Sequence, residues 1–62
     1  MKAKEIKNAV DQGLTVYYKD FTYTVVKSNN DYFIKASTGR MIGLTWEDGT
    51  TLNGKESDFF VK

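Results

Sequence analysis

A chain of 62 residues that contains neither cysteine nor histidine has to stabilise its fold by side-chain packing. A domain of this size buries only about 60% of the surface that its unfolded chain exposes, so small domains usually need a cross-link or a metal. Here no disulfide can form, and the usual zinc ligands are absent. Four Tyr, four Phe and one Trp can supply the missing stability by hydrophobic burial, because each ring buries about 150–250 Å². We therefore expect one domain with an aromatic-rich interior.

The first residues of the chain have the period of an amphipathic helix. The apolar residues that recur at helical spacing are Ala3, Ile6, Ala9 and Val10. Charged and polar residues fill the other positions, and Gly13 fits a left-handed C-cap. This pattern predicts a helix over residues 3–12. A helix of about ten residues is marginal alone in water, so we expect it to pack on the rest of the chain.

After Gly13 the apolar period changes to two, which is typical of strands. The runs are rich in Val, Thr and aromatic residues, which fit a pleated, half-buried surface, and no proline interrupts them. Asn, Asp and Gly separate the runs, and Asp48-Gly49 is the strongest hairpin signal. We predict strands over residues 14–19, 21–27, 32–37, 40–46 and 50–52, with a short final strand at 59–61.

These elements predict an α+β fold in which the short N-terminal helix packs on a meander of four or five antiparallel strands. Short strands joined by tight turns also suggest a small SH3-like barrel, and the turn before the last strand is compatible with that alternative. The residues that we expect to face inward are Ile6, Val10, Leu14, Val16, Tyr18, Phe21, Tyr23, Val25, Ile34, Ile42, Leu44, Trp46 and Phe59.

The second face of the predicted sheet mixes aromatic and Met side chains with Lys and Thr. Adjacent strand residues point to opposite faces, so Tyr17 and Tyr18 cannot both be buried. Aromatic and Met enrichment marks protein interfaces; alternatively, the curl of the sheet and the Lys stems cover these side chains. The predicted partner-binding residues are Tyr17, Lys19, Phe33, Lys35 and Met41. Their expected partner is another protein or a second copy of the chain.

Most catalytic sites need residue types that this chain lacks. Without His and Cys, neither Ser-His nor Cys-His nucleophile pairs can form. The adjacent carboxylates of Glu47 and Asp48 fall in the predicted Asp-Gly turn, where a structural role is expected. The glycines do not form a phosphate-binding pattern. We predict a non-enzymatic protein with no catalytic residue, no metal site, no cofactor and no small-molecule substrate.

The charge is balanced, with nine Lys and Arg against eight Asp and Glu. A net charge of +1 argues against a strongly basic DNA-binding protein. A small single-stranded nucleic-acid-binding module stays open as an alternative, because Lys19, Lys35 and Arg40 could act with the same aromatic residues. No apolar run approaches the length of a membrane span, and the first residues lack the apolar stretch of a signal peptide. We therefore expect a cytoplasmic protein that does not engage a membrane.

Two stretches resemble the small uncharacterised open reading frames of bacteriophages and prophages. They are Ala-Lys-Glu-Ile-Lys-Asn-Ala-Val-Asp-Gln-Gly at residues 3–13 and Ile-Gly-Leu-Thr-Trp-Glu-Asp-Gly at residues 42–49. The resemblance carries no functional residues. It implies an accessory protein in the host cytoplasm that binds a phage or host component. A minor structural protein of the virion is a further alternative.

Overall fold

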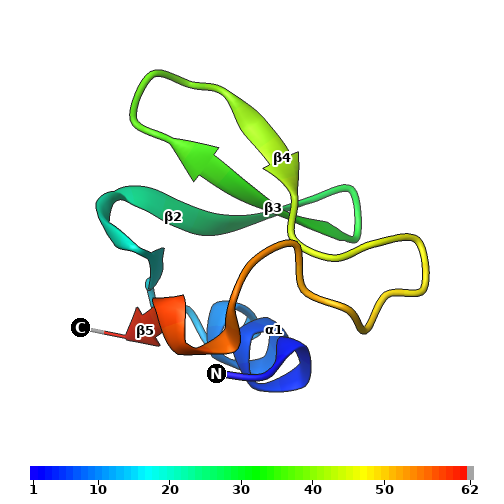
Figure 1. Cartoon of the computed structure of the whole chain (residues 1–62). Helices are drawn as coiled ribbons and strands as arrows, with labels where there is room; N and C mark the ends of the chain where they lie inside the picture. The colour runs from blue at the N-terminus through cyan, green and yellow to red at the C-terminus, as the bar shows by residue number, and fades with distance from the viewer. Residues whose placement is uncertain (62) are drawn as a thin grey trace.

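The computed structural model describes residues 1–61 and consists of one N-terminal helix packed on a five-stranded antiparallel sheet (Figure 1). The predicted α+β class is confirmed. In chain order, the elements are α1 (Ala3–Asp11), β1 (Val16–Tyr18), β2 (Asp20–Ser28), β3 (Asp31–Ala36), β4 (Met41–Gly43), the 3₁₀ helix η1 (Glu56–Asp58) and β5 (Phe59–Val61).

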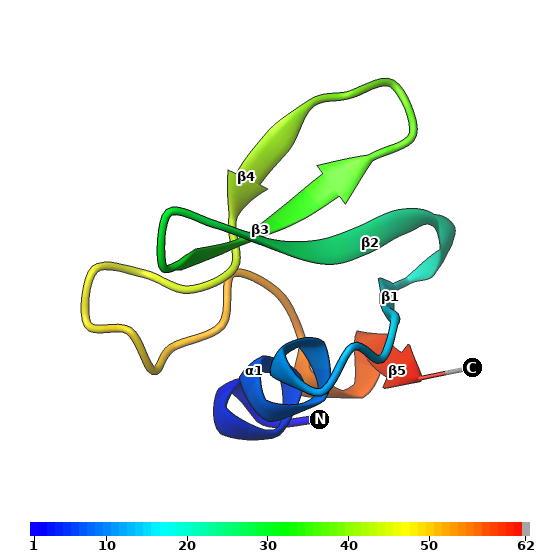
Figure 2. The ribbon, with the colours of Figure 1, turned by 180° about the vertical axis from the view of Figure 1, so that it is seen from behind.

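The strand order in the sheet is β4-β3-β2-β1-β5. Strands β1 to β4 form the expected meander, and β5 returns to lie antiparallel beside β1. Helix α1 lies at the end of the molecule that holds β1 and β5, whereas the β3–β4 hairpin extends away from it (Figures 1 and 2). Since β4 and β5 are opposite edges of the sheet, the sheet is open, and closure into an SH3-like barrel is not found in residues 1–61.

Helix α1 is capped at both ends by hydrogen bonds. At its start, the Lys2 N–H donates to Glu5 Oε1 at 2.8 Å. At its end, Gly13 has φ of 85°, a left-handed conformation that glycine adopts without steric cost. The Leu14 N–H then donates to the Ala9 carbonyl, and the Gly13 N–H donates to the Val10 carbonyl. This is the Schellman pattern, and it ends the helix at Asp11, one residue before the predicted end.

The core lies between α1 and the sheet. Its buried members are Ile6, Ala9, Val16, Val25, Ile34, Leu44 and Phe59. Within residues 1–61, no buried side-chain polar atom lacks a hydrogen-bond partner. The interior is therefore apolar, but the expected aromatic-rich interior is not found, because Phe59 is the one aromatic residue among the buried members of the described chain.

Five residues expected to face inward are instead substantially exposed. Tyr23 and Ile42 are on the core side of the sheet, but they are 37% and 44% exposed. Leu14 follows the helix cap outside the core, and Trp46, 64% exposed, belongs to the loop after β4. Phe21 is 62% exposed. A helix of nine residues is about 14 Å long, so it covers only part of one face of this sheet.

The segment after β4 is a loop, although the end of the strand at residues 40–46 and the whole strand at residues 50–52 were predicted there. Strand β4 ends at Gly43, and the predicted strand at residues 50–52 is reduced to one isolated bridge between Thr45 and Leu52. The Asp48 carboxylate accepts hydrogen bonds from the Thr50 N–H, the Thr51 N–H and the Thr51 hydroxyl. A side chain that satisfies these backbone donors replaces the ladder of a hairpin.

We expect Thr51→Ala to raise the pKa of Asp48. The Thr51 hydroxyl, followed by the Thr51 and Thr50 N–H groups, holds that pKa at about 2, below its ordinary 3.8. Because the folded pKa is depressed, the stabilisation of the loop is complete above about pH 4 and is lost as the pH falls towards 2. A carbon-13 NMR titration of the Asp48 carboxyl measures the change. Thr50→Ala is the control, since both N–H donors and the Thr51 hydroxyl remain; an equal shift in this variant would contradict the assignment.

Candidate binding surfaces

One face of the sheet points away from α1, and we call it the outer face. It is identified by alternation, because Val16, Val25, Ile34 and Phe59 share the buried core with Ile6 and Ala9 of α1, and the intervening residues point the other way. Cross-strand pairing aligns one row of outer-face residues from edge to edge: Phe60, Tyr17, Thr24, Lys35 and Met41. A second row contains Val26, Phe33 and Gly43.

Three aromatic rings pack together at one end of the outer face, and we call them the aromatic cluster: Tyr17, Phe21 and Phe60. The Tyr17 and Phe60 rings are stacked, with centroids 5.5 Å apart. Phe21 contacts both rings edge-on, at 4.8 Å from Tyr17 and 5.6 Å from Phe60. These are the geometries that aromatic pairs prefer. The three rings therefore support one another while Phe21 remains largely open to solvent.

A bulge in β2 places Phe21 in this cluster. Tyr17 pairs with Thr24, but the next residue, Tyr18, pairs with Asp20, so residues 21–23 have no partner on β1. Asp20 Oδ1 accepts hydrogen bonds from the Thr22 hydroxyl and N–H, and these bonds lower the pKa of Asp20. A bulge bends its strand and redirects side chains. Phe21 therefore leaves the core face that its alternation with Tyr23 predicts.

Four of the five predicted binding residues share the outer face. Tyr17 and Phe33 are half-buried, while Lys35 and Met41 are exposed, Met41 by 42%. The expectation that Lys19 lies beside Tyr17 is wrong. Lys19 has φ of 64° in the tight turn between β1 and β2, and this left-handed residue breaks the alternation. Its ammonium lies 5.4 Å from the centroid of the Tyr18 ring, on the core side of the sheet.

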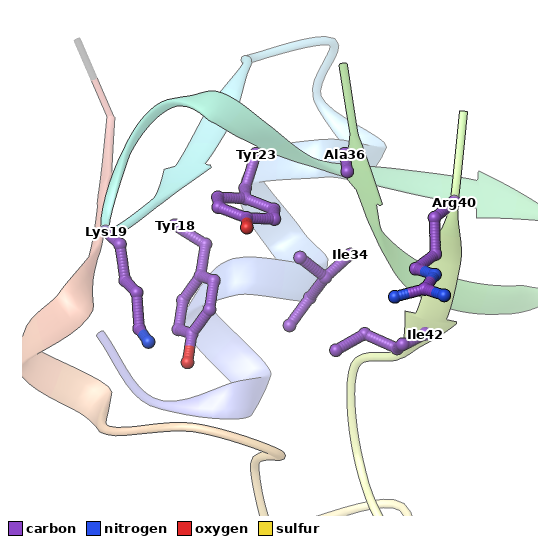
Figure 3. A pocket seen from close by; sticks show the side chains of 7 residues that line it. All are labelled: Tyr18, Lys19, Tyr23, Ile34, Ala36, Arg40 and Ile42. Atoms are coloured by element: carbon purple, nitrogen blue, oxygen red, sulfur yellow. The ribbon is translucent and has the colours of Figure 1, made fainter. Parts of the chain in front are cut away.

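A pocket of about 300 Å³ opens on the core side of the sheet, at the part that α1 does not reach. We call it the inner pocket. Figure 3 shows its side chains converging from β1, β2, β3 and β4, with Lys19 on one side and Arg40 on the other. The lining residues are Tyr18, Lys19, Tyr23, Ile34, Ala36, Arg40 and Ile42. Sequence reasoning missed this pocket because it assigned Tyr23 and Ile42 to the core.

The Tyr18 wall of the inner pocket is held from several sides. Its ring lies 4.6 Å from the Phe59 ring and 6.0 Å from the Tyr23 ring, between centroids. The backbone at Gly54 approaches so closely that a Cβ there would be 2.6 Å from Tyr18 Oη. Only glycine fits this approach without a shift of the ring, so the shape of the pocket depends on the loop before η1.

Another polar cluster joins the end of α1 to the β2–β3 hairpin. The Tyr32 hydroxyl donates to Asp11 Oδ1 at 2.6 Å, and Lys27 Nζ lies 3.4 Å from the same oxygen. The hydroxyl, together with Lys27, lowers the pKa of Asp11, and Asp11 in turn raises the pKa of Tyr32. Because Asp11 interacts with both Tyr32 and Lys27, this cluster connects α1 to the β2–β3 hairpin, and we assign it a structural role.

In the part of the chain that the structure describes, no group of three or more acidic side chains is arranged to hold a metal ion. Nor does that part contain a helix with the length and apolar character needed to cross a membrane. Comparisons with protein-family models, with curated proteins and with solved structures give no match for this chain.

Proposed function

We propose that this chain is a small non-enzymatic binding protein that engages another protein, or a second copy of itself, through the outer face of its sheet. The observation that carries the proposal is the aromatic cluster. Its three rings are in mutual contact on the face that α1 leaves uncovered, and Phe21 is 62% exposed. Covering the exposed part of this ring with a partner would remove apolar surface from water, which favours association.

The cluster has the physical properties of an interface anchor. Aromatic and Met side chains are enriched at the buried centre of protein interfaces, and a few clustered residues carry most of the binding energy. Because Tyr17, Phe21 and Phe60 already hold one another, little side-chain freedom remains to be lost on binding. Met41 lies at the far end of the same row, beyond Thr24 and Lys35, so the outer face carries apolar side chains at both edges of the sheet.

The charges of the outer face favour a protein partner over single-stranded nucleic acid. A nucleic-acid site needs cations close to its stacking rings. Of the cations that suggested this alternative, only Lys35 shares a face with the aromatic cluster, while Lys19 and Arg40 line the inner pocket. If the resemblance to bacteriophage reading frames holds, the partner would be a phage or host protein in the host cytoplasm.

Phe21→Ser is expected to weaken self-association or partner binding by about tenfold or more, which corresponds to about 1.4 kcal/mol or more. The variant should fold, because the Phe21 ring is mostly in water. Sedimentation velocity from micromolar to millimolar concentration measures self-association. A photoreactive amino acid at position 21 captures a partner in cells. Circular dichroism checks the fold.

Leu14→Ser is the matched control, because Leu14 is also exposed, at 49%, but lies in the connection between α1 and β1. It should associate as the unmodified chain does. Equal effects of the two substitutions would show that the outer face is not the contact surface. A chain that stays monomeric and captures no partner through position 21 would overturn the proposal.

A further inference from the structure

We infer that the inner pocket binds a short acidic peptide segment of a partner protein and takes up one of its apolar side chains. The proposal concerns a second surface, on the opposite side of the sheet from the aromatic cluster. It rests on three observations: an open apolar cavity, two cations on its rim, and the absence of acidic side chains from its lining.

The cavity exists because α1 is too short to cover the sheet. Ile34, at the edge of the pocket, is 1% exposed, but Tyr23 and Ile42 beside it are 37% and 44% exposed. The wall is rigid where Tyr18 is held against Phe59 and Gly54. A volume of about 300 Å³ accommodates one or two apolar side chains, and a preformed wall reduces the entropy lost on binding.

The two rim cations have anchored backbones, and among the described residues neither forms a salt bridge. The Lys19 N–H donates to the Asp58 carbonyl at 2.8 Å, and the Arg40 carbonyl accepts from the Ala36 N–H at 2.8 Å. Within residues 1–61, the one salt bridge joins Lys27 to Asp11, so neither rim cation has a carboxylate in contact. The nearby Asp20 carboxylate accepts hydrogen bonds from Thr22, and these bonds, with a smaller effect of the Lys19 charge, lower its pKa. The pocket therefore presents positive charge on both sides of an apolar floor (Figure 3).

This combination fits an acidic peptide better than a metabolite or a nucleic-acid strand. Small-molecule sites bury about 70–90% of their ligand, whereas this pocket is open through Tyr23 and Ile42. A single strand needs a basic groove that follows several phosphates, and two cations do not provide one. A peptide needs only one seated side chain, with flanking carboxylates that reach Lys19 and Arg40. Charge-assisted hydrogen bonds from the planar Arg guanidinium to a carboxylate are among the strong ones.

A random-peptide display library selected on the whole chain tests the inference. The selected peptides should share an apolar residue flanked by Asp or Glu. Fluorescence anisotropy of the best of these peptides should show binding that weakens by about tenfold or more in Arg40→Glu and falls as salt rises. NMR amide shifts should map to Tyr18, Tyr23 and Ile42.

Lys35→Glu is the matched control, because it makes the same change of charge on the outer face and should change the affinity by less than about twofold. Phe21→Ser should also leave peptide binding unchanged, so this inference and the proposed function can fail separately. Selected peptides without acidic residues, or equal losses in Arg40→Glu and Lys35→Glu, would overturn the inference. Tighter binding of oligothymidylate at the same amides would overturn it in favour of single-stranded nucleic acid.

Discussion

Ile34→Ala should destabilise the domain by about 2–5 kcal/mol, whereas Ile42→Ala should cost about 1 kcal/mol. The two residues are direct cross-strand partners on the same side of the sheet, in β3 and β4. They differ in burial: Ile34 is 1% exposed, whereas Ile42 is 44% exposed. Removing Ile34 leaves a cavity in the core, while removing Ile42 enlarges a pocket that water already enters.

Urea unfolding followed by circular dichroism measures both free energies of unfolding. A domain of this length has a total stability of about 3–9 kcal/mol, so Ile34→Ala can leave much of the chain unfolded in water. In that case, the folded fractions of Ile34→Ala and Ile42→Ala in the absence of urea are compared instead of their free energies of unfolding. Equal costs would contradict the difference in burial between Ile34 and Ile42 and remove the physical basis of the inner pocket.

Phe59→Ala should cost about 3–5 kcal/mol, and Phe60→Ala only about 1–2 kcal/mol. These neighbours in β5 point to opposite faces. Phe59 is 3% exposed and packs against Tyr18, so its loss opens the core next to β1. Phe60 is half-buried in the aromatic cluster, and its loss removes ring contacts with Tyr17 and Phe21.

Thermal unfolding of both variants measures the difference, and a binding assay separates their roles. Phe60→Ala should weaken association through the outer face while the chain stays folded. If Phe60→Ala destabilises the chain as much as Phe59→Ala, the outer face carries part of the core, and the proposed contact surface loses its support.

Simple periodicities account for the elements that were predicted well. Helical spacing of Ile6 and Ala9 located α1, and Gly13 marked its end because a left-handed cap favours glycine. Alternation assigned Phe59 to the core and Tyr17 to the other face, where the structure places them. These patterns are local, so they can be recognised without knowledge of the tertiary structure.

The errors arise where tertiary structure overrides a local pattern. Alternation fails at Lys19 and Phe21, because a left-handed non-glycine residue and a bulge interrupt the strand. The alternating pattern near Leu52 predicts a strand, but the segment forms a loop in which the Asp48 carboxylate accepts hydrogen bonds from Thr51. The inner pocket could not be predicted, because no sequence pattern states how much of a sheet a nine-residue helix covers.

The pairing of β5 with β1 has a consequence for how the chain is made. Within this sheet, β1 precedes the other strands in the chain, whereas β5, which pairs with its other edge and places Phe59 in the core, follows them all. The β2–β3–β4 hairpins can form during translation, whereas Tyr18 has no ring from β5 beside it until the ribosome has added the final strand. The sheet can therefore be completed only once β5 has left the ribosome, and Phe59 cannot enter the core before then.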